Sequence, residues 1–228
     1  YQPGKTIFKF DTSLRSIDSF LSPATSPYGL TFDGKYLWLM EYAKPLVYQL
    51  DLTGKAIKSI PAPGEHCMGL AWDGKYLWTI PSDEPSRLYK FDTLGNIAGI
   101  VQTGAAGANG IACDGRRLWV VETGDDMICE IEPSDGRIIR SITTPGDRTF
   151  GMAWQGPYLW CTDWTNEQTG GGRVFKILPM EEKITIDGLR DDWLNFTPLI
   201  YDPEGDNIKE TTDIKSIYGF TDYKYFYL

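Results

Sequence analysis

The stretch YGLTFDGKYLWLMEY, from Tyr28 to Tyr42, decides the fold, because close copies of it return three times along the chain. The copies read MGLAWDGKYLWTIP from Met68, NGIACDGRRLWVVE from Asn109 and FGMAWQGPYLWCTD from Phe150. Their tryptophans are spaced by 40, 41 and 41 residues and are Trp38, Trp78, Trp119 and Trp160. A fixed period of that length indicates an array of similar supersecondary units.

Each copy opens with a predicted β-hairpin. A short apolar run reaches Asp-Gly, or Gln-Gly in the fourth copy, and continues into an alternating aromatic run. We expect Asp-Gly to supply the two positive-φ positions of a tight turn. A third alternating run follows, as LVYQLD, RLYKFD, MICEIE and, after a longer loop, RVFKIL. A turn then leads to a fourth run, AIKSI, IAGIV or RIIRSI. Four antiparallel strands in about 40 residues form the blade of a β-propeller.

The predicted fold class is therefore all-β, a propeller of four-stranded blades. Packing blades around an axis buries both faces of each blade and leaves only short strand edges. Large aromatic side chains suit the wedge between blades, since each buries on the order of 150–250 Å². We interpret the tryptophan row as core between blades, and the alternative is a platform on which a sugar ring stacks.

The repeats do not add up to a closed ring. Residues 1 to 22 contain TIFKFD and SIDSFL, which match the third and fourth strands of a blade without its first two. The fourth copy has three strands, with KITI from Lys183 to Ile186 as a candidate fourth. The chain thus holds about four and a half blades. Either it is part of a longer chain, or another chain completes the unpaired strands, which favours a homo-oligomer or fibre.

Composition indicates a soluble, β-rich protein. The chain has 228 residues, 14% of them aromatic, which suffices for one propeller and a smaller second piece. A net charge of −9 argues against nucleic acid as a partner and against binding to anionic membranes by charge alone. No apolar run approaches the roughly 18 residues of a membrane span. No secretory signal is visible, but the chain starts at Tyr1 without methionine, so a removed signal is an open alternative.

The four cysteines do not settle the redox compartment, and they allow three disulfide pairings. Cys113 and Cys129 align with the first and third strands of one blade, which places them about 10 Å apart, too far for a disulfide. We interpret both as buried thiols. A bond between Cys67 and Cys161 would have to cross the ring.

The GLAWDGKYLW hairpin, followed by LYKFD and a D-x-x-G turn, resembles the YVTN/NHL-like β-propeller repeats of secreted bacterial and archaeal proteins. This resemblance covers residues 1–180 and implies the fold but no single activity, because such propellers include lyases, lactonases, cyclotransferases and non-enzymatic scaffolds. Residues 181–228 contain IDG, DW, DPEGD and DIK and resemble the opening of β-sandwich modules related to family 9 carbohydrate-binding and DOMON-like domains. We therefore expect a propeller over 1–180 and a partial β-sandwich over 181–228.

Candidate ligand-binding residues lie where the chain enters the first strand and leaves the second strand of each copy, since both positions lie on the face of a propeller that usually carries its binding site. The residues at the start are Tyr28, His66, Asn109 and Phe150, and those at the exit are Glu41, Pro81, Glu122 and Asp163. We predict an axial mouth at which the three carboxylates hold a cation or a sugar. The alternative is a set of solvated strand ends.

His66 is the only histidine of the chain. A lone imidazole can act as a general base. No second histidine or cysteine stands at a zinc-site spacing from it, which leaves a structural role as the alternative.

An acidic segment in the tail predicts a calcium site. Its residues, close to Gly205, are Asp202, Glu204, Asp206 and Asp213. Calcium takes six to eight oxygen ligands, and the sandwich resemblance also implies structural calcium in this region. The alternative is a plain acidic turn. Asn195 begins an Asn-Phe-Thr sequon, which predicts a glycan if the chain passes through a glycosylating pathway.

Together these features favour a non-catalytic, extracellular or cell-surface protein with a structural or binding role, stabilised by calcium and self-associating through its unfinished edges. One alternative is a propeller enzyme of the lyase or cyclotransferase type, using His66 and the carboxylates of the axial mouth. Another is a carbohydrate-binding module that uses Trp164 and Trp193. The sequence contains no G-x-S-x-G, H-E-x-x-H or phosphate-loop motif.

Overall fold

The computed structural model describes residues 5–11, 15–82, 86–105, 107–146, 148–163 and 173–179, and four short strands near the end of the chain. The chain divides into two compact units, Tyr1–Ile177 and Leu178–Leu228. In the second unit, β18 (Ile200–Tyr201) pairs with β19 (Ser216–Ile217), and β20 (Phe220–Thr221) pairs with β21 (Phe226–Tyr227). The proposed fourth strand at 183–186 lies outside the described residues, and the sandwich over 181–228 stays a prediction.

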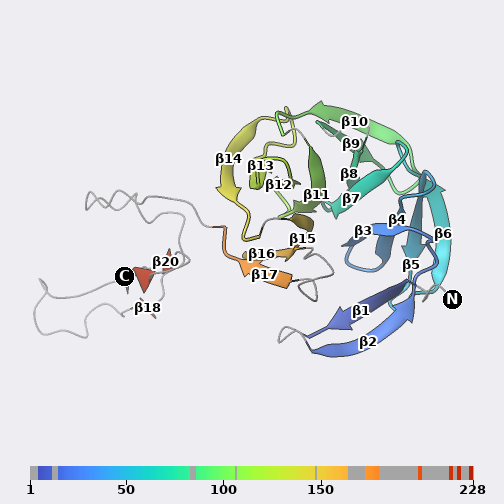
Figure 1. The fold of residues 1–228 in the computed structure, drawn as a ribbon, viewed down its shortest axis with the longest axis horizontal. Helices are drawn as coiled ribbons and strands as arrows, with labels where there is room; N and C mark the ends of the chain where they lie inside the picture. Colours follow the sequence, from blue (N-terminus) through green and yellow to red (C-terminus); the bar gives the residue numbers. More distant parts are fainter. Residues whose placement is uncertain are drawn as a thin grey trace, which may run out of the picture. The chain divides into compact units, whose positions relative to one another are not determined.

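The first unit is an all-β propeller arrangement, as the repeats predict (Figure 1). Blade 1 consists of β3 (Pro27–Phe32), β4 (Leu37–Glu41), β5 (Leu46–Leu50) and β6 (Ala56–Pro61). Blade 2 consists of β7 (Cys67–Trp72), β8 (Leu77–Pro81), β9 (Arg87–Phe91) and β10 (Ile97–Gln102). Blade 3 consists of β11 (Ala108–Cys113), β12 (Leu118–Glu122), β13 (Met127–Ile131) and β14 (Ile138–Thr143).

Two incomplete sheets accompany the three full blades. Blade 4 has three described strands, β15 (Thr149–Gln155), β16 (Tyr158–Asp163) and β17 (Arg173–Ile177). At the other end of the chain, β1 (Thr6–Phe10) and β2 (Ser16–Leu21) form a two-stranded antiparallel sheet. Every pairing within these sheets is antiparallel, so the sequence prediction of a propeller with an orphan strand pair is confirmed.

The first strand of each blade is its innermost strand, and these strands follow one another around the axis. β3 contacts β7, β7 contacts β11, and β11 contacts β15. A glycine lies at each point of close approach. A Cβ atom on Gly29 would lie 2.5 Å from the backbone nitrogen of Leu70, and one on Gly110 would lie 2.0 Å from the carbonyl oxygen of Phe150. The inner strands therefore pack backbone against backbone, which only glycine permits at these positions.

The turn between the first two strands differs in one respect from the prediction. Of the Asp-Gly pair, only the glycine has positive φ, at 95° in Gly34, 95° in Gly74 and 92° in Gly115. The expectation of two positive-φ residues was wrong because the loop spans four residues, with the pairs Phe32 and Leu37 flanking it in blade 1. A two-residue turn would need both residues to have positive φ, whereas this longer turn does not.

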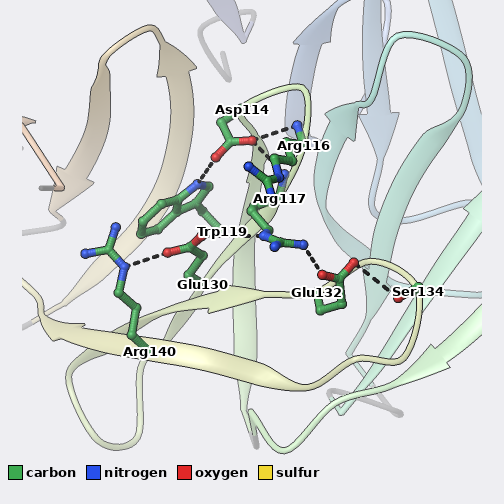
Figure 2. Close-up of polar contacts among 8 residues, drawn as sticks. All are labelled: Asp114, Arg116, Arg117, Trp119, Glu130, Glu132, Ser134 and Arg140. Carbon is green, nitrogen blue, oxygen red and sulfur yellow. Dashed lines mark hydrogen bonds and ion pairs between the residues drawn. The ribbon is translucent and has the colours of Figure 1, made fainter. Parts of the chain in front are cut away.

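The aspartate of this turn instead joins the turn to the tryptophan row, as Figure 2 shows for blade 3. Asp114 accepts hydrogen bonds from the backbone N–H groups of Arg116 at 2.7 Å and Arg117 at 2.6 Å. Its second oxygen accepts one from the indole N–H of Trp119 at 3.0 Å. Blades 1 and 2 repeat this arrangement with Asp33 and Asp73, and in blade 4 Gln155 accepts from Trp160. The carboxylate thus fixes both the turn and the ring.

Blade 3 adds a network of charges beside its tryptophan (Figure 2). Arg140 donates to Glu130 at 2.5 Å, and its guanidinium lies 5.1 Å from the centre of the Trp119 ring. Arg117 forms ion pairs with Glu130 and Glu132. In blades 1 and 2 a single lysine, Lys58 or Lys90, covers the tryptophan ring. A cation over the indole face is therefore common to these three blades.

The tryptophans occupy the junctions between blades. The exposed fraction of the side chain is 0% for Trp38, 0% for Trp78 and 2% for Trp119, and each shares a core cluster with residues of the following blade. Trp160 has no following blade among the described residues, and it is only half-buried. The interpretation of this row as core between blades is confirmed for the first three.

The β1–β2 pair takes the place of the outer strands of a blade that precedes blade 1. The evidence is a contact that recurs in each full blade. The glycine in the turn between the third and fourth strands packs against the end of the last strand of the preceding blade. A Cβ on Gly95 would lie 2.9 Å from the carbonyl oxygen of Pro61, and one on Gly136 would lie 2.0 Å from that of Gln102. Gly54 of blade 1 lies against β2 in the corresponding place, although there the nearest atoms belong to the side-chain ring of Phe20.

All four cysteines are free thiols, as expected for Cys113 and Cys129. Cys129 is buried, whereas Cys113 is only partly buried, so its interpretation as a buried thiol holds in part. Burial raises the pKa of Cys113 to about 11 and that of Cys161 to about 12. Neither thiol is therefore activated as a nucleophile.

Over the part of the chain that the structure describes, no helix is long and apolar enough to cross a membrane.

Candidate functional site

The inner strands surround a cavity of about 680 Å³ on the axis. Each strand contributes the residue before its glycine and the residue after it. The residues before the glycine are Tyr28, Met68, Asn109 and Phe150, and those after it are Leu30, Leu70, Ile111 and Met152. On one side the cavity continues over Ala153, Trp160 and Thr162 of blade 4. Its lining is apolar and aromatic except at a few positions, and it includes no carboxylate or histidine of the described residues.

Three of the four residues that the sequence places at the start of the first strands do line this cavity. These are Tyr28, Asn109 and Phe150, but in blade 2 the residue is Met68 and not His66. His66 precedes Met68 by two residues, in the position that Ser26 has in blade 1. The glycine that follows the lining residue in every inner strand aligns Met68, and not His66, with Tyr28, Asn109 and Phe150. A ligand-binding role of His66 stays a prediction.

His66 instead belongs to a row of three rings on the loop side of blades 1 and 2. Its ring centre lies 5.0 Å from that of Tyr42, which stacks on Tyr28 at 4.8 Å. The His66 backbone has a φ of 52°, which is uncommon for a residue other than glycine. Its side chain is exposed, and its carbonyl accepts from the N–H of Ser82 at 3.2 Å. His66 thus does not line the cavity. Its ring contacts Tyr42, and Tyr42 contacts Tyr28, which is part of the lining.

The three predicted carboxylates are buried and do not face the cavity. The exposed fraction is 1% for Glu41, 9% for Glu122 and 3% for Asp163. They are therefore not the solvated strand ends that formed the alternative prediction. Among the described residues, no three histidine, cysteine or acidic side chains gather where they could hold a metal ion. The structure thus does not bring these carboxylates together around a cation.

Glu41 holds the loop that leads into its own blade. One carboxylate oxygen accepts from the N–H of Thr25 at 2.5 Å and from its hydroxyl at 2.9 Å. The other accepts from the N–H of Ser26 at 2.9 Å and of Ala43 at 3.1 Å. Burial pushes the pKa of Glu41 up, but these hydrogen bonds outweigh it and hold the pKa below its ordinary value of 4.5.

Asp163 has the same position in blade 4, and its partners differ. It accepts from the N–H of Arg148 at 2.9 Å and from the Arg173 guanidinium at 2.6 Å. A Cβ on Gly146 would lie 2.5 Å from the Asp163 carboxylate, so the loop before β15 is packed directly on it. In blade 2, where Pro81 replaces the carboxylate, the ring of Pro81 packs on Gly64 of the corresponding loop. The strand-end residue therefore supports the preceding loop in each of these blades.

Replacing Glu41 with glutamine is expected to lower the free energy of unfolding by about 2 kcal/mol at neutral pH, because both carboxylate oxygens accept backbone hydrogen bonds and an amide offers only one acceptor. The folded-state pKa of Glu41 is depressed, so this contribution is present above about pH 4.5 and is lost as the pH falls through the folded-state pKa. Urea unfolding at several pH values tests this. Glu65→Gln, at an exposed position, is the control and should change stability by less than about 0.5 kcal/mol.

The remaining candidates lie outside the described residues. These are the predicted calcium ligands Asp202, Glu204, Asp206 and Asp213, the sequon at Asn195, and the two tryptophans of the carbohydrate alternative, Trp164 and Trp193. They stay predictions from the sequence.

Chemically, the cavity can accept an apolar or aromatic group and offers few polar contacts. Asn109 is the polar residue among the four before the glycines. Its amide nitrogen donates to the Thr123 hydroxyl at 2.6 Å and to the Gly107 carbonyl at 3.0 Å. With both amide hydrogens engaged, Asn109 can still offer its Oδ1 atom to a ligand as an acceptor.

No protein family model matches the sequence. No curated protein matches it either. Solved structures do match the fold. Glutaminyl cyclase of Myxococcus xanthus aligns with a TM-score of 0.60 and 15% identity, over 75% of this chain and 80% of that one. A chain in the structure of a nidogen/laminin complex aligns with a TM-score of 0.52 and 16% identity, over 75% of this chain and 85% of that one. At these identities the similarity establishes the β-propeller fold and leaves the function open.

Proposed function

We propose that this chain is a non-catalytic binding propeller that receives an apolar or aromatic group of its ligand at the axial mouth. The observation that carries the proposal is the ring of Tyr28, Met68, Asn109 and Phe150 around the axial cavity. Ligand sites are typically concave and largely apolar, with a small number of polar groups that set orientation. Asn109 is suited to that orienting role.

The propeller-enzyme alternative receives less support from the same site. General acid–base catalysis needs a titratable group within hydrogen-bond reach of the substrate. Glu41 and Asp163 already accept backbone and guanidinium hydrogen bonds that hold loops, and His66 is not part of the cavity lining. Acid–base chemistry at the mouth would have to use other residues.

Several finer proposals rest on the sequence. The repeats resemble the YVTN/NHL-like type, whose members are often secreted, and on that basis we propose an extracellular or cell-surface location. Calcium binding and the carbohydrate-binding or DOMON-like module remain proposals for residues 181–228. Self-association through unfinished edges is a proposal that concerns β1 and blade 4.

The binding proposal is tested with N-phenyl-1-naphthylamine, a neutral aromatic probe whose fluorescence rises in apolar sites. We expect one saturable site per chain. Tyr28→Ala should weaken probe binding about fivefold, because an aromatic contact contributes about 1 kcal/mol. Tyr28 is largely exposed, so this change should leave the fold intact.

Phe32→Ala is the matched control, since Phe32 is an exposed aromatic residue on the same strand that does not line the cavity. It should change probe affinity less than twofold. Absence of saturable binding, or an equal effect of the two substitutions, would contradict the proposal.

A further inference from the structure

A second tier of side chains lies beside the cavity lining, on the residue that follows the strand-end carboxylate. This residue is Tyr42 in blade 1 and Thr123 in blade 3. Each contacts the lining residue of its own blade. The Tyr42 ring stacks on that of Tyr28 with centres 4.8 Å apart, and the Thr123 hydroxyl accepts from the Asn109 amide at 2.6 Å. In blade 1 the second tier is therefore an aromatic ring that continues the lining outward.

His66 extends this tier to blade 2. Its ring centre lies 5.0 Å from that of Tyr42, and the two planes are tilted by 51°. Tyr42 is half-buried, whereas His66 is exposed. Tyr28, Tyr42 and His66 together form what we call the ring row, which runs from the cavity lining to the loop before β7. A ligand with one group in the cavity can therefore reach the ring row with its next group.

The polar ends of the ring row are available to a ligand. Within the part of the chain that the structure describes, the hydroxyls of Tyr28 and Tyr42 and the imidazole of His66 make no hydrogen bond or ion pair. No lysine or arginine there covers these rings either, whereas Tyr36 and Tyr76 each have a lysine ammonium group over their ring. The ring row thus combines apolar ring surface with groups that can donate and accept hydrogen bonds.

The backbone of His66 supports a role for its side chain. His66 precedes the lining residue Met68 by two residues, as Gly107 precedes Asn109 in blade 3. Both positions have positive φ, 52° for His66 and 82° for Gly107. Glycine adopts this conformation readily, whereas a side chain strains it. Blade 2 therefore holds an exposed imidazole where glycine would suit the backbone better, and such strained positions cluster at binding sites.

We propose that the ring row is a second subsite of the axial mouth and binds a hydroxylated ring, such as a pyranose, that is joined to the apolar group in the cavity. The rings of Tyr42 and His66 offer apolar surface to the C–H groups of the sugar. The two phenol hydroxyls and the imidazole hydrogen-bond to its hydroxyls. The ligand class is then an aryl glycoside or a compound of similar build. This inference rests on the proposed function, because the cavity holds the other end of the ligand.

Two compounds that differ by one sugar test the inference. The first, 2-naphthyl β-D-glucopyranoside, carries both groups, whereas 2-naphthol carries the apolar group alone. Calorimetry should find that the glucoside binds about tenfold more tightly, because the ring row makes hydrogen bonds to the sugar. The glucoside should also displace N-phenyl-1-naphthylamine, since its naphthyl group occupies the same cavity. The ratio of the two dissociation constants separates the ring row from any change in the cavity.

Two variants locate the sugar contact. His66→Gly should reduce the ratio from about tenfold to about twofold. Glycine suits the positive φ, so the midpoint of urea unfolding should not fall, and the affinity for 2-naphthol should stay within about twofold. Tyr42→Phe keeps the stacked ring and removes only the hydroxyl, and it should reduce the ratio to about threefold.

Asp126→Gly is the matched control. Apart from His66, Asp126 is the one described residue other than glycine with positive φ, at 53°, and it is exposed. It lies just before β13 in blade 3 and belongs neither to the cavity lining nor to the ring row. The substitution makes the same backbone change as His66→Gly and should leave the ratio at about tenfold.

Equal affinities for the glucoside and 2-naphthol in the unsubstituted chain would overturn the inference. So would a ratio that His66→Gly and Tyr42→Phe leave unchanged, or one that Asp126→Gly lowers as much. A His66→Gly chain that loses affinity for both compounds alike would overturn it too, because the effect would then be structural. In these cases binding of 2-naphthol to the unsubstituted chain leaves the proposed function standing. If neither compound nor N-phenyl-1-naphthylamine binds, the proposed function fails and this inference fails with it.

Discussion

Replacing Gly110 with alanine is expected to lower the free energy of unfolding by about 3 kcal/mol. The added Cβ would lie 2.0 Å from the carbonyl oxygen of Phe150 and 3.0 Å from Cγ1 of Val121. The first of these atoms belongs to the backbone of the neighbouring inner strand and cannot rotate away. β11 and β15 would have to separate, which would disturb the junction between blades 3 and 4. Urea unfolding followed by tryptophan fluorescence measures the change.

Gly99→Ala provides the matched control for that experiment. Gly99 lies in β10, an outer strand, and a Cβ there would meet no atom within 4 Å. We expect the free energy of unfolding to change by less than about 0.5 kcal/mol. Similar effects at Gly110 and Gly99 would mean that the inner strands do not pack as closely as the structure has them.

Trp78→Ala should be the most damaging side-chain truncation, at about 4 kcal/mol. Trp78 is fully buried between blades 2 and 3, and it donates to Asp73 at 2.7 Å. Its ring also lies 5.1 Å from the ammonium group of Lys90. The substitution therefore leaves a large cavity at the junction and removes the indole donor from the Asp73 carboxylate.

Trp160→Ala serves as the comparison, because Trp160 is the equivalent tryptophan of blade 4. Trp160 holds the equivalent position and also donates to its turn, to Gln155 at 3.0 Å, but it has no covering blade among the described residues. We expect Trp160→Ala to lower the free energy of unfolding by less than half as much as Trp78→Ala, because the Trp160 ring buries less apolar surface. Equal losses would contradict the account of the tryptophan row as junction core.

Most of the propeller could be predicted from the sequence because its determinants are local and repeated. The tryptophan period, the turn glycines and the alternating strands each report on backbone geometry within a few residues. The orphan strands at residues 6–10 and 16–21 could be recognised in the same way, since they copy the outer strands of a blade. The turn type was misjudged because Asp33 acts through its side chain, on the backbone N–H groups of the turn and on Trp38.

The candidate site could be predicted only in part, because it depends on contacts between blades. The glycine that precedes Leu30, Leu70, Ile111 and Met152 was a visible signal that would have aligned the four inner strands and given Met68 in place of His66. The burial of Glu41 had no such signal. Its carboxylate reaches loop residues 25 and 26, and that contact is set by the path of the loop.

Ligand binding at the axial mouth is the central claim, and methionine methyl NMR tests it most directly. Of the described methionines, Met68 and Met152 line the cavity, whereas Met40 and Met127 lie in or against cores between blades. On addition of N-phenyl-1-naphthylamine, we predict that the methyl signals of Met68 and Met152 shift and saturate together, while those of Met40 and Met127 stay in place. Saturable binding that leaves Met68 and Met152 unmoved would contradict the claim.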